Sequence, residues 1–221
     1  MPTHLKIDFV SDISCPWCAI GLSALEQALQ RLAPEIAAEL HFQPFELNPG
    51  MPPGGQDITE HLTQKYGSSA EAQDEIRETI RQRGAALGFT FRQAGRERIY
   101  NTFDAHRLLH WAGLPTTLPA GRQHALKKAL LQAYFTFGES PASHDVLQRV
   151  AVEVGLDPAR TAEILAGHAY ADAVRQRQQH YAEAGIQSVP AVIINDEFLI
   201  TGGQPVDIFE QALRRIAAGE A

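Results

Sequence analysis

The chain has 221 residues, of which 44% are hydrophobic and 20% charged, and its formal net charge is −7 at pH 7. This composition is that of an ordinary soluble globular protein, and it excludes the disordered, collagen-like and coiled-coil classes. Because acidic residues are in excess and no run of basic residues occurs, we expect neither nucleic acid nor an anionic membrane surface as a partner.

The first ten residues lack the basic start, the long apolar stretch and the small-residue cleavage site of a secretory leader. No later apolar run is long enough to span a bilayer. We therefore expect a cytoplasmic protein. Its oligomeric state does not follow from the sequence.

The predicted elements begin with a β-α-β unit. An apolar run at residues 5–10 predicts a short buried strand. Leucines at steps of three and four residues over 22–32 predict a helix that ends at Pro34, and the alternating stretch 40–45 predicts a second strand. The segment 48–56 holds three prolines and three glycines, which predicts a break in regular structure.

From residue 57 to residue 185 the periodicity is helical almost throughout, and glycines stand where helices are expected to end. Two helix starts can be placed in this region. Ser68 with Glu71 resembles a capping box, and Asp157 followed by Pro158 is typical of an N-cap with proline at the first helical position.

The pattern changes abruptly after this region. Residues 190–194 and 198–200 predict a hairpin of two buried strands, and a final amphipathic helix follows Gly203. Because a hairpin alone is barely stable, the strands at the two ends of the chain are expected to share one sheet.

The helical region is then an insertion within a discontinuous domain. We predict an α/β fold in the order β-α-β, helices, β-β-α. Residues 1–52 and 168–221 form the α/β domain, and residues 53–167 form an all-helical insertion domain.

Cys15 and Cys18 are the only cysteines of the chain, and they lie where the first strand is followed by a helix. Pro16 suits the first helical turn, where a missing N–H costs nothing. Because a helix N-terminus stabilises an anion, Cys15 is expected to be an exposed thiolate with a lowered pKa. Such a thiolate attacks a partner's disulfide, and Cys18 then resolves the mixed disulfide, leaving an internal Cys15–Cys18 bond.

Two other interpretations of this pair stay open. A zinc site needs about four ligands, so two of the nine histidines would have to complete it. Two inert buried thiols are the other alternative, although packing hardly explains Pro16 and Trp17 between them. A structural disulfide across so small a loop would constrain the unfolded chain little. The redox interpretation is preferred.

Four segments together resemble the DsbA-family thioredoxin-fold oxidoreductases, and most closely their cytosolic FrnE-like branch. They are Cys15-Pro16-Trp17-Cys18, Ser188-Val189-Pro190, Gly202-Gly203-Gln204-Pro205 and the stretch 101–112. The resemblance implies a thioredoxin fold interrupted by a large all-helical insertion. It also implies a protein-disulfide oxidoreductase that works as a reductase, isomerase or oxidase through a redox-active CPWC motif.

Carried over residue by residue, the resemblance makes Cys15 the nucleophile, Cys18 the resolving thiol and Pro190 a cis-proline that faces them. A cis bond would turn the backbone of Val189 toward the thiols, where it could pair with an extended substrate. A trans proline that merely begins an edge strand is the alternative.

The same resemblance indicates what the protein binds. Pro16, Trp17 and Val189 are the expected substrate-binding residues. Disulfide- or thiol-containing proteins or small molecules are the expected substrates. No bound cofactor or metal is implied, and glutathione or another thiol is the expected redox partner.

Trp17 stands where periplasmic DsbA proteins commonly carry histidine, so weaker oxidising power is expected. Cytosolic glutathione would then favour reductase or isomerase work. The alternative activity is a glutathione-dependent isomerase resembling 2-hydroxychromene-2-carboxylate isomerases, which usually have serine in place of the first cysteine. A non-catalytic holdase with an apolar groove is a third hypothesis.

Three further features have both a functional and a structural interpretation. Asp8, on the first strand, is a candidate proton relay to the resolving thiol or an ordinary strand residue. His106 and His110 share a helix face without a nearby third ligand, so a packed or solvated face is preferred over a metal site. Aromatic residues of the insertion could border a substrate groove but more often form a core. They are Phe103, Trp111, Tyr134, Phe135 and Phe137.

Overall fold

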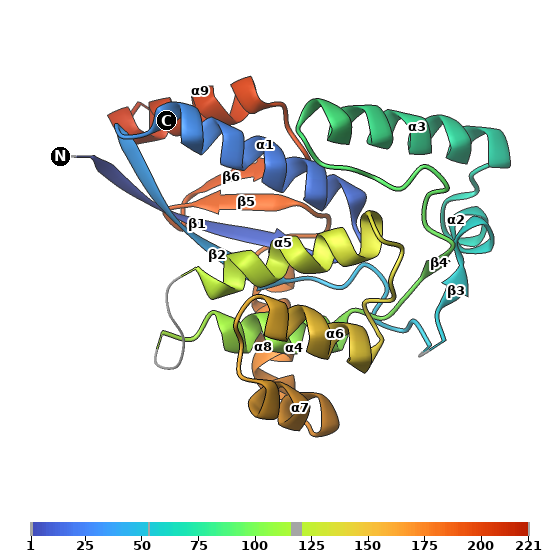
Figure 1. Ribbon diagram of the computed structural model, residues 1–221. Coiled ribbons are helices and arrows are strands. Elements are labelled where there is room, and N and C mark those ends of the chain that lie inside the picture. Colours follow the sequence, from blue (N-terminus) through green and yellow to red (C-terminus); the bar gives the residue numbers. More distant parts are fainter. Residues whose placement is uncertain (1, 53, 116–120, 221) are drawn as a thin grey trace.

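Strands from the two ends of the chain form one central sheet. The computed structural model describes residues 2–52, 54–115 and 121–220. β1 (Thr3–Ser11) pairs in parallel with β2 (Ile36–Pro44) and antiparallel with β5 (Ala191–Ile194). β6 (Phe198–Thr201) continues the sheet, whose order is β2-β1-β5-β6 (Figure 1). The predicted sharing of a sheet by both chain ends is confirmed.

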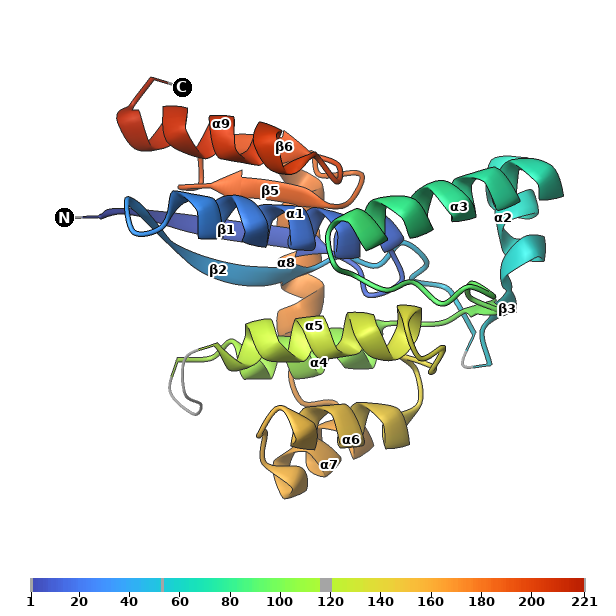
Figure 2. The same ribbon diagram turned by 45° about the horizontal axis from the view of Figure 1, so that its top comes forward.

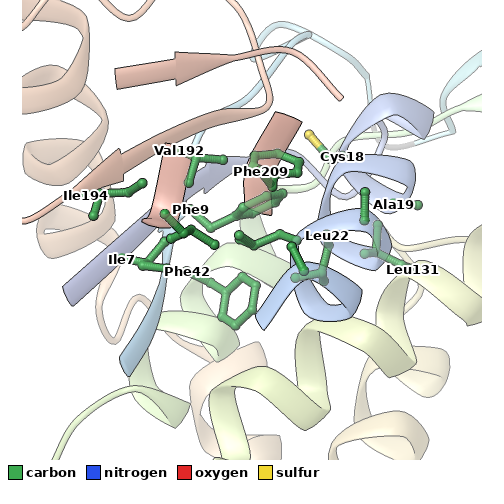
Figure 3. Packing of buried hydrophobic residues seen from close by; sticks show 14 of the residues in the cluster. Ile7, Phe9, Cys18, Ala19, Leu22, Phe42, Leu131, Val192, Ile194 and Phe209 are labelled. Atoms are coloured by element: carbon green, nitrogen blue, oxygen red, sulfur yellow. The ribbon is translucent and has the colours of Figure 1, made fainter. Parts of the chain in front are cut away.

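The alternation of side chains along β1 decides which helices cover each face. Ile7 and Phe9 lie in the apolar cluster formed with α1 (Pro16–Leu32) and α9 (Val206–Ala218), as Figure 3 shows for the residues it labels. Val10 points to the other face, where it contacts Tyr181 of α8 (Ala171–Glu183). This β-α-β and β-β-α arrangement around one sheet is the predicted thioredoxin fold.

The remaining elements lie between β2 and α8 in the sequence. They are β3 (Gln56–Asp57), α2 (Ile58–Tyr66), α3 (Ala70–Ala86), β4 (Arg98–Ile99), α4 (Phe103–Ala112), α5 (Arg122–Phe135), α6 (His144–Glu153) and α7 (Pro158–Ala166). α4 to α7 surround an apolar cluster of their own that reaches Ile13, directly after β1. Figure 2 shows these four helices on one side of the sheet, away from α9.

Polar contacts join this helical region to the sheet and to α1. The Gln123 side chain of α5 accepts from the Phe42 N–H and donates to the Phe42 carbonyl oxygen, each at 3.0 Å. Gln27 of α1 donates to the Leu87 carbonyl oxygen, just after α3, at 3.1 Å. The helical region therefore packs directly on the α/β core.

Several element bounds differ from the sequence prediction. α1 begins at Pro16, the residue predicted for its first turn, whereas β2 begins at Ile36, before the predicted stretch 40–45. Asp157 caps α7 as predicted, whereas Ser69, not Ser68, caps α3 by accepting from the Ala72 N–H. The β3–β4 ladder was not predicted, since two residues show no alternation. The division of the chain at residues 52 and 168 stays a prediction.

Within the described residues, no helix combines the length and the apolar character that crossing a membrane requires.

Candidate active site

The two cysteines lie where β1 ends and α1 begins. Cys15 is the N-cap of α1, with extended backbone, and Pro16 takes the first helical position. The Cys18 N–H donates to the Cys15 carbonyl oxygen at 3.1 Å, which sets the second thiol one turn deeper. Both are free thiols. The local sequence thus positions the pair as predicted.

The expected exposure of Cys15 is wrong, because its side chain is 3% exposed and that of Cys18 is 0% exposed. Tyr134 and Phe135 of α5 belong to the same buried cluster as the two cysteines. These residues lie more than one hundred positions away in the sequence, so the pattern around the CPWC segment could not indicate that they cover it.

The segment before β5 faces Cys15. The Val189–Pro190 peptide bond is cis, and the Cys15 thiol donates to the Val189 carbonyl oxygen at 3.5 Å. A Cβ atom added at Gly21 of α1 would lie 3.1 Å from Pro190 Cγ. A larger residue at position 21 would crowd the Pro190 ring, which therefore packs closely against the helix that carries the thiols.

The loop before α9 completes the same junction. A Cβ atom added at Gly203 would lie 2.9 Å from the Trp17 carbonyl oxygen. The Arg83 guanidinium of α3 donates to the Gly203 carbonyl oxygen at 2.8 Å and lies over the Trp17 ring, 5.1 Å from its centroid. Three segments that are distant in sequence therefore meet beside Cys15.

The surroundings push the pKa values of the two thiols apart. A hydrogen bond from the Cys18 side chain, with the N–H groups of Cys18 and Trp17, lowers the pKa of Cys15, although burial and Asp12 oppose this. Burial, and then the neighbouring Cys15, raise the pKa of Cys18 well above that of a free thiol, and Lys127 counteracts only part of this. Cys15 is the thiol that ionises first.

We expect iodoacetamide to label Cys15 faster than Cys18 in the reduced, folded protein at pH 7. The pKa of Cys15 is lowered, so its thiolate persists as the pH falls toward neutrality, whereas the raised pKa of Cys18 restricts its thiolate to high pH. Fragment-ion mass spectrometry can assign the label, and urea-denatured protein is the control in which the rates converge. Equal rates in the folded protein would contradict the assignment.

A buried carboxylate that was missed by the sequence prediction supports the loop before Cys15. Asp12 accepts from the Ser14 N–H at 3.1 Å and hydroxyl at 2.7 Å, from the Leu47 N–H at 2.7 Å and from the Thr102 hydroxyl at 2.8 Å. Burial would raise its pKa, but the nearby His106, followed by the Leu47 and Ser14 donors, outweighs burial and lowers it to about 2. Asp12 is therefore a permanent anion beside the thiols.

A buried lysine is the second group that the sequence prediction missed. Lys127 of α5 is 0% exposed. Burial lowers its pKa to about 8, although Cys18, Asp12 and Cys15 act to raise it. In the sequence it stands beside Lys128, which is exposed, and nothing in that pair indicates which one points inward.

Asp8 does not lie near the thiols. It alternates with Ile7 and Phe9 along β1, so its side chain is on the face of the sheet opposite α1. There it accepts a hydrogen bond from Gln43 and pairs with Lys6. The structural interpretation of Asp8 is therefore the correct one.

The two histidines of α4 have different surroundings. His106 is buried with Nε2 at 3.6 Å from Asp12 Oδ1, whereas His110 packs against the Tyr170 ring. In the described ranges, no group of three or more His, Cys, Asp or Glu residues is placed to hold a metal ion.

Two grooves flank the cysteine pair. Pro16 lines one of about 490 Å³, together with residues of α2 and α3, and Phe135 borders it. Trp17 and Val189 line the other, of about 820 Å³, together with Arg83. Of the remaining aromatic candidates, Tyr134 and Trp111 are buried in the core, Phe103 lies under the Arg175 guanidinium, and Phe137 is 67% exposed.

Comparison with known proteins gives the same fold and suggests a chemistry. A family model described as DSBA-like thioredoxin domain matches residues 6–214. The crystal structure of a probable DsbA oxidoreductase, SCO1869 from Streptomyces coelicolor, is similar with 34% identity and a TM-score of 0.88, over 99% of this chain and 92% of that chain.

Two more distant structures share the fold alone. A 2-hydroxychromene-2-carboxylate isomerase is 15% identical with a TM-score of 0.71, over 97% of each chain. The cytosolic disulfide reductase DsbM from Pseudomonas aeruginosa, solved with GSH, is 16% identical with a TM-score of 0.64, over 96% of this chain and 99% of that chain.

Proposed function

We propose that this chain, which belongs to the DSBA-like thioredoxin domain family, is an oxidoreductase that exchanges disulfides through Cys15 and Cys18. The observation that carries the proposal is the contrast between the two thiols. They lie at the start of one helix, and the pKa of Cys15 is lowered while that of Cys18 is raised. Thiol–disulfide exchange needs one nucleophilic thiolate and one thiol held in reserve.

The exchange proceeds in two displacements. The Cys15 thiolate attacks one sulfur of a substrate disulfide, that S–S bond breaks, and the first substrate thiolate leaves. Cys18 then attacks Cys15 Sγ, the Cys15–Cys18 disulfide forms, and the second substrate thiolate leaves. Two electrons pass from the enzyme dithiol to the substrate, and an external thiol such as glutathione returns them.

Substrate lies across the junction between the two grooves in this proposal. Trp17 and Val189 line one groove and Pro16 the other, so a chain that crosses between them passes over Pro16 and Trp17, next to Cys15. The Val189 backbone beside the thiol would pair with an extended peptide in the manner of an added strand. Proteins or small molecules with disulfides are the proposed substrates, and the cytoplasm is the proposed location.

Reduction of insulin disulfides tests the proposal. With glutathione as reductant, wild-type protein should precipitate the insulin B chain well above the uncatalysed rate, and Cys15→Ser should return the rate to background. An aggregation assay with a reduced client protein runs in parallel. If the wild type and Cys15→Ser both suppress aggregation and neither reduces insulin, the protein is a holdase and the oxidoreductase proposal is contradicted.

The isomerase alternative has a different signature. Its relatives usually place serine at the position of Cys15 and use the thiol of glutathione, so Cys15→Ser would leave such an activity intact. An activity that is lost in Cys15→Ser is therefore disulfide exchange, whereas an activity that Cys15→Ser retains is the glutathione-dependent isomerisation.

A further inference from the structure

A stripe of α5 residues faces the α/β core beneath the cysteines. Gln123, Lys127, Leu131 and Tyr134 follow one another at three- and four-residue steps, so they share one helix face. Gln123 bonds the backbone of Phe42 in β2. Leu131 and Tyr134 belong to the cluster that holds both cysteines. Lys127 stands between these contacts and points into the same interface.

The surroundings of Lys127 agree with this placement. Figure 3 shows Leu131, one turn further along α5, beside Ala19 of α1, and both line a small cavity together with Leu22. The Lys127 side chain is 0% exposed, whereas Lys128 is exposed and pairs with Glu26 at 2.9 Å. A buried ammonium group is costly unless charges offset it or it loses its proton.

The charges that act on Lys127 belong to groups at the start of α1 and just after β1. Cys18, Asp12 and Cys15 all act to raise its pKa. His106 of α4 lies 3.6 Å from Asp12. β2 contributes the apolar Phe42 to this interface. Since burial outweighs these neighbours, the Lys127 pKa is about 8, and the amine exchanges its proton near neutral pH.

The buried carboxyl groups of Asp12 and Asp8 do not offer an alternative base for Cys18. Asp12 holds four hydrogen bonds and has a pKa of about 2, so it stays ionised. Asp8 is on the opposite face of the sheet. The burial of Cys18 nevertheless makes its thiol hard to ionise, so the resolving step needs a nearby base.

We propose, on the basis of the proposed function, that Lys127 accepts the proton of Cys18 during the resolving step. In the mixed-disulfide state the neutral Lys127 amine takes the Cys18 thiol proton, and the new thiolate attacks Cys15 Sγ. The Cys15–Cys18 bond forms as the bond between Cys15 and the substrate sulfur breaks. The substrate leaves as a thiolate with two electrons from the enzyme, and Lys127 returns its proton to solvent.

The reaction of the reduced protein with dithiobis(nitrobenzoate) separates the two steps. Attack by Cys15 releases one thionitrobenzoate, and resolution by Cys18 releases a second. In the wild type, the second phase should accelerate with pH through an inflexion at the Lys127 pKa, about 8. Lys127→Met should slow the second phase at neutral pH by at least about tenfold and remove that inflexion, while the first phase persists.

Two further variants separate proton transfer from charge and from folding. Lys127→Arg keeps a cation that cannot accept a proton, so it should resolve as slowly as Lys127→Met. Lys128→Met, the matched surface change, should leave both phases as in the wild type. The proposal is overturned if the rate of the second phase in the wild type shows no inflexion with pH, or if Lys127→Arg resolves as fast as the wild type. The wild-type measurement decides the matter even if Lys127→Met does not fold. Absence of the first phase in the wild type would instead refute the proposed function.

Discussion

Cys18→Ser protein should accumulate mixed disulfides with its partners, whereas Cys15→Ser protein should form none and lose disulfide exchange to background. Cys15 is the thiol with the lowered pKa and lies beside Val189, whereas Cys18 is one turn deeper and has a raised pKa. Without Cys18 the first displacement still occurs, but no internal thiol releases the substrate.

Non-reducing gels of protein incubated with oxidised insulin or oxidised glutathione measure this difference. The adducts should disappear on addition of dithiothreitol, and the double variant Cys15→Ser/Cys18→Ser should show none. Adducts of equal yield in Cys15→Ser and Cys18→Ser would mean that either thiol can attack, which contradicts the order of thiols on α1.

The reduction potential of the wild-type pair should lie well below the roughly −120 mV of DsbA and nearer to the range from thioredoxin to glutaredoxin. Trp17 carries no charge with which to stabilise the Cys15 thiolate, so that thiolate is stabilised by the Cys18 side chain and by the N–H groups of Cys18 and Trp17.

Trp17→His should raise the potential and lower the pKa of Cys15 together, because a histidinium stabilises the adjacent thiolate. Equilibration with glutathione resolves the change, since about 30 mV corresponds to about 1.4 kcal/mol. A wild-type potential near that of DsbA, or a downward shift in Trp17→His, would show that residue 17 does not control thiolate stability.

The structure adds a control for this experiment. The Arg83 guanidinium lies 5.1 Å from the Trp17 ring centroid, so it would repel a histidinium at position 17. Trp17→His/Arg83→Gln should therefore shift the potential further upward than Trp17→His alone. Arg83→Gln alone is the baseline for that comparison.

The parts of the fold that could be predicted from the sequence are those specified by local pattern. The alternating and helical repeats near β1, α1, β5 and α9 predicted the sheet and its covering helices, and the CPWC segment predicted where the thiols lie. The two-residue strands β3 and β4 escaped prediction because so short a ladder leaves no periodic signal.

The interior of the site could not be predicted for a different reason. Asp12 and Lys127 are charged residues whose pKa values depend on their buried surroundings, and only tertiary packing shows that they are buried. Asp8 is a case in which the sequence left two interpretations open. A one-residue offset along a strand moves a side chain to the other face, and Asp8 lies on the face away from the thiols.

The two hydrogen bonds between Gln123 and Phe42 also bear on self-association. β2 is an edge strand of the central sheet, and an edge strand with free backbone groups is a template for pairing with another molecule. The Gln123 amide occupies both outward-facing backbone groups of Phe42, as a neighbouring strand would. Since the same face of α5 carries Lys127 and covers the cysteines, displacement of this helix would open the redox centre and expose an aggregation-prone edge at the same time.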